Sequence, residues 1–317
     1  MGVAVADRSV PTTPRPAARR SSRRGAGRRA WRDYLVFLLF VGPNVLLIAA
    51  FVYRPLIVNI YYSTLDWTLG SPTARQIGFG NYREFFTTPA YRQVLWTTAI
   101  FTVATVGGAM ILGLALATVL ARPLWGRTVA RATVFAPFVL SGVGIGLAWT
   151  FIFDPTTGVI GAILRALGSS SPQWFTNPHL SLTMLIIVYV WKNLGYCAVI
   201  YVAALQAMNK EVLEASSIDG AGAWRTFRSI TLPLLSPTTF FLMLTSILNS
   251  LQAFDLIKIM TPLGNGTTTL MYATYLQAFG GYNRAGFSAA IATILFAILL
   301  VMTVIQLTLL ERRVHYA

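Results

Sequence analysis

Polar and ionisable side chains inside two long apolar runs are the residues of this sequence best placed to do chemistry. In the run 181–206, Lys192 and Asn193 lie near the middle, with Tyr189 and Tyr196 within one helical turn. Tyr189, Asn193 and Tyr196 follow one another at i, i+4 and i+7, so a helix would carry them on one face. A lysine at the centre of a membrane helix costs about 2.5–3.5 kcal/mol on insertion scales. Either an anionic ligand such as a phosphate, or an acidic group on a neighbouring helix or subunit, would offset that cost.

The run 238–261 carries a second polar stripe. Ser246, Asn249 and Ser250 follow one another at helical spacing, and Gln252 continues the side on which Asn249 lies. This stripe has the same depth in its run as the first, so the two stripes together would suit the wall of a passage for a polar solute. The alternative is structural, with amides and hydroxyls that hydrogen-bond between helices and tyrosines that pack.

The remaining ionisable residues argue against an enzyme site. Asp255 and Lys258 are three residues apart near the end of the second run, and we expect an ion pair between them. Asp255 is the one acid inside an apolar run, and no histidine lies in one. Cys197 is the one cysteine, and His179 and His315 are far apart. The sequence therefore predicts no disulfide, no metal site and no catalytic residues.

The composition predicts an all-α membrane protein. Of 317 residues, 55% are hydrophobic and 11% are charged, whereas a soluble domain carries roughly a quarter charged residues. Six apolar runs approach or exceed the ~20 residues that span a bilayer as a helix. Their continuity excludes the alternating pattern of a membrane barrel. The predicted spans lie near 34–53, 95–121, 132–153, 181–206, 238–261 and 287–310.

The distribution of the net charge of +15 predicts the membrane topology. Residues 1–32 contain nine arginines without an apolar period, and we expect a disordered, basic, cytoplasmic tail. With the N-terminus inside, the cytoplasmic connections carry about three times as many Lys and Arg as the outer ones, so both termini should be cytoplasmic. This pattern fits phospholipid headgroups and predicts no nucleic-acid partner. Residues 33–317 would form one six-helix domain, and the apolar run after the tail is too long for a cleaved signal peptide.

The connection 207–236 predicts a helix–turn–helix that projects from the membrane. Asn209 suits a helix N-cap, and Glu211 lies in the first turn, where the helix dipole favours an acid. Gly220 suits a helix stop, and a second amphipathic segment ends before Pro233. Such a unit can fit a groove on a soluble partner; the alternative is an ordinary amphipathic loop.

The same connection resembles the EAA loop of permease subunits in binding-protein-dependent ABC importers. Glu214-Ala215-Ser216, then Gly220, then Ile230-x-Leu232-Pro233 match its order and spacing, with Ser216 in place of the second alanine. In that family the loop is the coupling helix, which docks into a cleft of the ATPase subunit. The resemblance therefore implies ATPase-coupling roles for these residues: Glu214, Ala215, Ser216, Asp219, Gly220, Ile230, Leu232 and Pro233.

The resemblance covers nearly all of the chain after the tail. The stretches 254–255 and 260–270 are similar to the FD and TTTL stretches of the maltose and glycerol-phosphate permeases. The stretches 41–44, 53–56, 134–139 and 189–196 resemble most the A-type permease of actinobacterial sn-glycerol-3-phosphate and glycerophosphodiester importers. In maltose-type relatives, residues at corresponding offsets from the EAA glutamate contact sugar, which favours solute contacts for the two polar stripes.

The resemblance implies a type I importer permease in the bacterial cytoplasmic membrane that works by alternating access. Its partners would be a second permease subunit in a heterodimer, two copies of an ABC ATPase and an extracytoplasmic substrate-binding protein. No phosphate-binding P-loop is present, so ATP and Mg²⁺ would sit on the ATPase and this chain would bind no cofactor. The expected cargo is a glycerophosphodiester or sn-glycerol-3-phosphate, whose phosphate Lys192 would attract. Alternatives are a neutral sugar or oligosaccharide and, outside this class, an intramembrane enzyme or an ATP-independent carrier.

Overall fold

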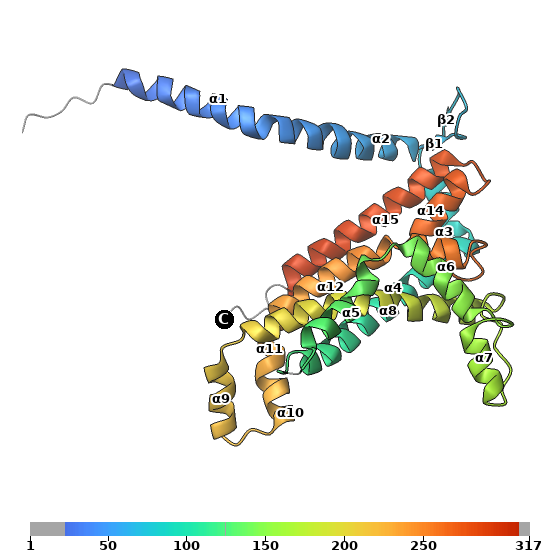
Figure 1. Cartoon of the computed structure of the whole chain (residues 1–317). Coiled ribbons are helices and arrows are strands. Elements are labelled where there is room, and N and C mark those ends of the chain that lie inside the picture. Colours follow the sequence, from blue (N-terminus) through green and yellow to red (C-terminus); the bar gives the residue numbers. More distant parts are fainter. Residues whose placement is uncertain (1–22, 124, 311–317) are drawn as a thin grey trace, which may run out of the picture. The chain divides into compact units, whose positions relative to one another are not determined.

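The computed structural model describes residues 23–123 and 125–310 of the chain. Figure 1 shows the chain and its elements. The chain falls into two units, Met1–Ile57 and Val58–Ala317. The basic segment before residue 23 and His315 lie outside the described residues.

The described part of the first unit is helical. Helix α1 (Arg23–Ile48) continues through a π-helical turn (Ala49–Tyr53) into α2 (Arg54–Tyr62). The helical segment Val36–Tyr62 is long and apolar enough to span a membrane. Large apolar side chains such as Phe40 and Phe51 are about three-quarters exposed, as expected for a helix that faces lipid or other helices. Helix α1 begins at Arg23, so the helical backbone extends into the segment that was predicted to be a disordered tail up to residue 32. Arginine and alanine, which are frequent in that segment, are good helix formers.

The second unit contains four further helical spans at the predicted positions. They are α4 (Pro89–Leu120), α8 (Pro178–Ala207), α12 (Ser236–Leu251) with α13 (Asp255–Met260), and α15 (Ala285–Ile305). Together with the first unit, five helices of the described chain are long and apolar enough to cross a membrane, or six when a bent pair counts as one span. The predicted all-α fold with six spans is confirmed in this sense.

The third predicted span, 132–153, is wrong as a single helix. It consists of α5 (Arg127–Val139) and α6 (Gly142–Phe153), whose axes meet at 98°. Pro137 lies near the end of α5, and Leu140 is extended with ψ of 149°. Proline provides no N–H for the helix, and an extended residue stops it, so a new helix starts in another direction. The fifth span has a milder interruption at 252–254, where Phe254 leaves helical geometry.

The connections of the second unit gather at the two ends of its helices. At one end lie the strands β1 (Leu65–Asp66) and β2 (Arg75–Gln76), with the helices α3 (Gly80–Thr87), α7 (Val159–Ala166) and α14 (Leu270–Phe279). Arg284 pairs with Glu84 there, and the Asn265 amide donates to the carbonyl oxygen of Phe175. These contacts join all three connections that were predicted to lie outside. The connection between α8 and α12 is at the other end (Figure 1); its predicted cytoplasmic side stays a prediction.

The core of this unit divides midway along α8. Met184, Leu185 and Val188 of α8 pack with α6, α13 and α14, whereas Cys197 and Tyr201 pack with α4 and α12. The first predicted polar stripe lies at this division, with Tyr189 packed against the first cluster and Tyr196 against the second. Lys192 and Asn193 therefore lie in a polar layer between the two apolar clusters.

Candidate translocation pathway and coupling site

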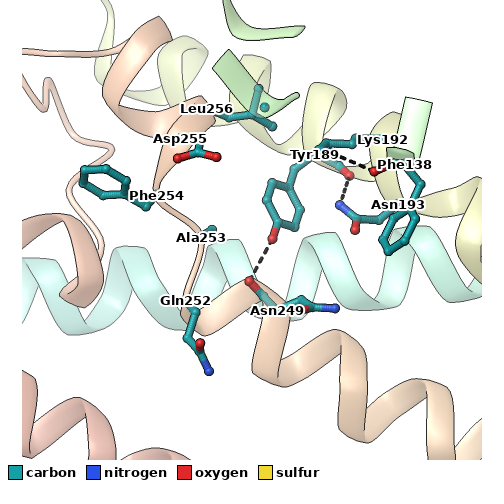
Figure 2. A pocket seen from close by; sticks show the side chains of 11 residues that line it. Phe138, Tyr189, Lys192, Asn193, Asn249, Gln252, Ala253, Phe254, Asp255 and Leu256 are labelled. Carbon is teal, nitrogen blue, oxygen red and sulfur yellow. Dashed lines mark hydrogen bonds between the residues drawn. The ribbon is translucent and has the colours of Figure 1, made fainter. Parts of the chain in front are cut away.

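A cavity of about 440 Å³ lies at this polar layer. Its walls come from the α5–α6 bend, the middle of α8 and the interruption between α12 and α13 (Figure 2). It is open to one side. The lining residues are Phe138, Gly142, Tyr189, Lys192, Asn193, Asn249, Gln252, Ala253, Phe254, Asp255 and Leu256.

Lys192 is held by backbone carbonyl groups at the bend. Its Nζ donates to the carbonyl oxygens of Phe138 at 3.2 Å and Leu140 at 3.1 Å. The salt bridges of the described residues do not include Lys192. Its insertion cost is therefore offset by carbonyl oxygens that the bend leaves without helix partners.

Tyr189 and Asn193 connect α8 to the interrupted fifth span. The Tyr189 hydroxyl donates to the carbonyl oxygen of Asn249 at 2.8 Å, and the Asn193 amide donates to the carbonyl oxygen of Tyr189 at 2.8 Å (Figure 2). Asn249 and Gln252 line the same cavity. Five of the eight predicted pathway residues thus come together around one cavity: Tyr189, Lys192, Asn193, Asn249 and Gln252.

The other three predicted pathway residues make contacts within the helix bundle. The ring of Tyr196 stacks on Phe138 with centroids 4.7 Å apart. Ser250 is buried and hydrogen-bonds to Thr105 of α4 at 2.9 Å, and Ser246 lies 4.0 Å from the thiol of Cys197. Ser246 and Ser250 line a void of about 10 Å³. Their geometry is that of interhelical hydrogen bonding.

Asp255 lines the cavity, although the sequence predicted only an ion pair for it. The predicted ion pair between Asp255 and Lys258 is wrong, because neither residue belongs to a salt bridge of the described chain. Lys258 Nζ instead lies 4.6 Å from the ring centroid of Tyr275 and 5.5 Å from that of Phe254. Helix α13 begins at Asp255, which places this residue at the cavity wall. The sequence did contain one indication that Asp255 belongs to the cavity, because it is an acid inside an apolar run.

The connection after α8 is a pair of short helices, as predicted. Helix α9 (Lys210–Ile218) begins after Asn209, whose side-chain oxygen accepts the backbone N–H of Glu211 at 3.0 Å. Gly220 has φ of +73°, and the N–H of Ala221 donates to the carbonyl oxygen of Ser216 at 3.0 Å. This is the Schellman ending that glycine favours. The predicted cap and stop are both confirmed.

The chain then returns through α10 (Ala223–Thr226), a π-helical turn (Phe227–Thr231) and α11 (Leu232–Leu234). The Ser216 hydroxyl lies 3.4 Å from that of Thr226 and is buried, so it ties α9 to α10. Ile218 is 85% exposed and Trp224 is 71% exposed, beside the exposed residues Glu214 and Asp219. Ile230 and Pro233 are half-buried, Leu232 is exposed, and Ala215 lies on α9. The pair thus presents an apolar and acidic surface at its tip.

A multi-pass helical protein with a polar cavity beside the middle of α8 and a helix pair at one end has the layout of a membrane transport subunit. Residues 109–316 match the sequence profile of the family described as the binding-protein-dependent transport system inner membrane component. The chain belongs to this family. The family prediction made from the EAA loop is therefore confirmed.

Relatives of known name are permease subunits of transport systems. The chain is 31% identical to the sulfoquinovosyl glycerol transport system permease protein SmoG of Agrobacterium fabrum, over 89% of this chain and 92% of that one. It is 33% identical to the sn-glycerol-3-phosphate transport system permease protein UgpA of the same organism, over 88% and 95% of the two chains. A solved bacterial ABC transporter involved in the import of the acidic polysaccharide alginate has a chain of the same fold. That comparison gives a TM-score of 0.78 at 22% identity, over 90% of this chain and 99% of that chain.

These findings define the chain at the level of its class. It is a multi-pass inner-membrane permease subunit of an ABC importer of the sugar and glycerol-phosphate class. It is not an enzyme, since ATP hydrolysis in these transporters is carried out by a separate subunit. The alternatives of an intramembrane enzyme and an ATP-independent carrier are thereby set aside.

Proposed function

We propose that this chain is one half of the translocation pathway of an importer for sn-glycerol-3-phosphate or glycerophosphodiesters. A second permease subunit completes the pathway, two copies of an ABC ATPase with ATP and Mg²⁺ drive it, and an extracytoplasmic binding protein delivers the solute. The cavity supports the first part, because one open wall needs a facing subunit. Val103 and Phe151, both about three-quarters exposed, supply apolar surface for a facing subunit or lipid.

The observation that carries the cargo proposal is the position of Lys192. A lysine in a cavity at mid-depth is costly, and such residues mark solute pathways in transporters. Its ammonium has three N–H donors, and two carbonyl oxygens engage it. A donor therefore remains for the phosphate of a solute, and the amides of Asn193, Asn249 and Gln252 suit its hydroxyl groups. UgpA, a relative at 33% identity, is a permease of sn-glycerol-3-phosphate transport.

A neutral sugar or oligosaccharide is the second candidate cargo. Asp255 lines the same cavity and would repel an anion. Amides and aromatic rings, which make up much of the remaining lining, are the groups that bind uncharged sugars through hydrogen bonds and ring contacts.

We further propose that α9 and the turn after it dock into the ATPase and transmit its closure to the spans by alternating access. The contact residues would be Glu214, Ala215, Asp219 and Gly220. The exposed Ile218 and Trp224 add apolar area at the tip, and the tie between Ser216 and Thr226 lets the helix pair move as one piece. Crosslinking of the variant Asp219→Cys to single-cysteine ATPase variants tests this contact, and a complex that forms without any such crosslink contradicts it.

The cargo is tested with the assembled importer in proteoliposomes. The measurement is uptake of sn-glycerol-3-phosphate, a glycerophosphodiester and a neutral disaccharide, each with the cognate binding protein. We expect uptake of the phosphate compounds, with at least a tenfold loss in the variant Lys192→Met. Uptake of the disaccharide alone would establish the second candidate. Unchanged phosphate uptake in Lys192→Met would remove this lysine from the pathway.

A further inference from the structure

Two broken spans meet at the cavity, and a side chain of α8 bonds to a backbone carbonyl oxygen at each break. The third span breaks between Val139 and Gly142, and the fifth between Leu251 and Asp255. Each break frees backbone carbonyl oxygens at the end of the preceding helix. Inside a membrane such groups need a donor from the protein or from water in the cavity, and each costs several kcal/mol if it stays unsatisfied.

At the α5–α6 bend, Lys192 is the donor to the freed carbonyl oxygens. In a continuous helix the carbonyl oxygen of Phe138 would accept from residue 142, but Gly142 starts a helix in a direction 98° away. Lys192 Nζ takes over as the donor to Phe138 and also to Leu140. A cation at the C-terminal end of α5 is favoured by the helix dipole as well.

At the α12–α13 break, Tyr189 is the donor to a freed carbonyl oxygen. The N–H of Ala253 turns to the carbonyl oxygen of Ser250 at 3.1 Å, instead of reaching back to Asn249. The freed carbonyl oxygen of Asn249 accepts the hydroxyl of Tyr189 at 2.8 Å (Figure 2). Tyr189 and Lys192 are one helical turn apart on α8.

We propose that Lys192 and Tyr189 are positioning residues that cap the two broken spans from one turn of α8 and so hold the breaks in register. The inference goes beyond the proposed function, because it applies to any solute that the cavity admits.

The packing around the third span couples its break angle to the relative positions of the neighbouring helices. Helix α5 lies against α8, where a side chain at Gly195 would overlap the backbone of Val134. Helix α6 packs mainly against α13, where side chains at Gly142 and Gly146 would come within 2.9 Å of Asp255 and Ile259. The two halves of the third span thus have different main neighbours, although α6 also touches α8. A change in the break angle moves one pair of helices relative to the other, as alternating access requires.

The test is hydrogen exchange of the backbone amides in the assembled importer, without solute, read in peptides that cover 135–146 and 248–256. The variants are Lys192→Met, which keeps the length of the side chain without donors, and Tyr189→Phe, which removes one hydroxyl. Lys192→Arg restores donors. Lys258→Met is the matched control, because Lys258 contacts aromatic rings and no carbonyl in the described residues.

We expect Lys192→Met to speed exchange at least tenfold in 135–146 and to leave 248–256 nearly unchanged. Tyr189→Phe should speed exchange about fivefold in 248–256 and leave 135–146 nearly unchanged. Lys192→Arg should keep the slow exchange of the unmodified chain in 135–146. ATPase activity without binding protein should rise in both capless variants. Equal exchange in all variants, faster exchange in both segments for each variant, or the same pattern in Lys258→Met would overturn the proposal. Should Lys192→Met fail to assemble, Tyr189→Phe decides alone. Loss of phosphate uptake in Lys192→Met with normal exchange would overturn the capping proposal and leave the cargo proposal standing. Faster exchange with unchanged phosphate uptake would do the reverse.

Discussion

The contact between α5 and α8 at Gly195 gives a prediction whose size follows from the structure. In the variant Gly195→Ala the added methyl group would overlap the carbonyl oxygen of Val134 and come within 2.8 Å of its carbonyl carbon and 3.1 Å of the Cα of Phe135. Carbon atoms pack at about 3.5–4.0 Å, so α5 would have to retreat by roughly 1 Å. All three atoms belong to the backbone, so no side-chain rotation relieves the clash.

This retreat has a second cost at the bend. It would stretch the bonds from Lys192 to Phe138 and Leu140, now 3.2 and 3.1 Å, beyond hydrogen-bonding range. Overpacking costs about 1–3 kcal/mol, and a hydrogen bond to a charged group contributes about 1.5–3 kcal/mol. Because the two losses share one displacement, we expect a total of about 3 kcal/mol. That corresponds to a fall of the unfolding midpoint by roughly 6–12 °C.

The assay is thermal unfolding of the purified permease in lipid nanodiscs. The matched control is Gly107→Ala on α4, because a methyl group at Gly107 would meet nothing within 4 Å. We expect the control to unfold at the temperature of the unmodified chain or slightly above it, because alanine favours a helix more than glycine does. If Gly195→Ala unfolds at the same temperature as Gly107→Ala, the close packing of α5 on α8 is refuted, and the geometry of the Lys192 cap with it.

Three further perturbations test other parts of the chain. Gly220→Ala places a side chain at φ of +73°, which costs about 1 kcal/mol, so the affinity for the ATPase should fall about fivefold. Gly220→Asn should bind nearly normally, because asparagine tolerates this conformation. Equal affinities of the two variants would contradict the left-handed conformation of residue 220. The bidentate pair of Arg284 and Glu84, at 2.7 and 2.6 Å and about 40% exposed, should show a coupling of about 1 kcal/mol in a double-mutant cycle of unfolding, and zero coupling would refute it. Backbone N–H donation from Thr157 and its neighbour lowers the pKa of Asp154, so the stabilisation is complete above about pH 4 and is lost as the pH falls through the lowered value. Hydrogen exchange of the Thr157 amide should therefore show an Asp154→Asn effect at pH 7 that vanishes in strong acid, and an effect independent of pH would contradict this.

Local sequence chemistry predicted the coupling region well because its geometry is set by neighbouring residues. The cap by Asn209 and the left-handed Gly220 each depend on a turn of a few residues, and both are present as expected. The spacing of the two polar stripes also placed Lys192, Asn193 and Asn249 at one depth, since helical periodicity fixes which residues share a face.

The sequence did not predict which stripe residues face the cavity. Ser250 and Asn249 are adjacent and equally polar, yet Ser250 bonds to Thr105 of α4 while Asn249 lines the cavity. The difference arises from a neighbour 145 positions away. Asp255 shows the same dependence, because the interruption at 252–254 sets its direction.

The amino-acid sequence by itself determined the membrane class, the number of spans, the family and the helix pair after α8, because length, apolar periodicity and turn residues are local properties. Only the tertiary structure decided that the third span bends by 98° and that Lys192 and Tyr189 bond to the carbonyl oxygens freed at two breaks. A freed carbonyl must find a donor wherever the fold brings one, and on this chain α8 supplies both donors from a distant part of the sequence.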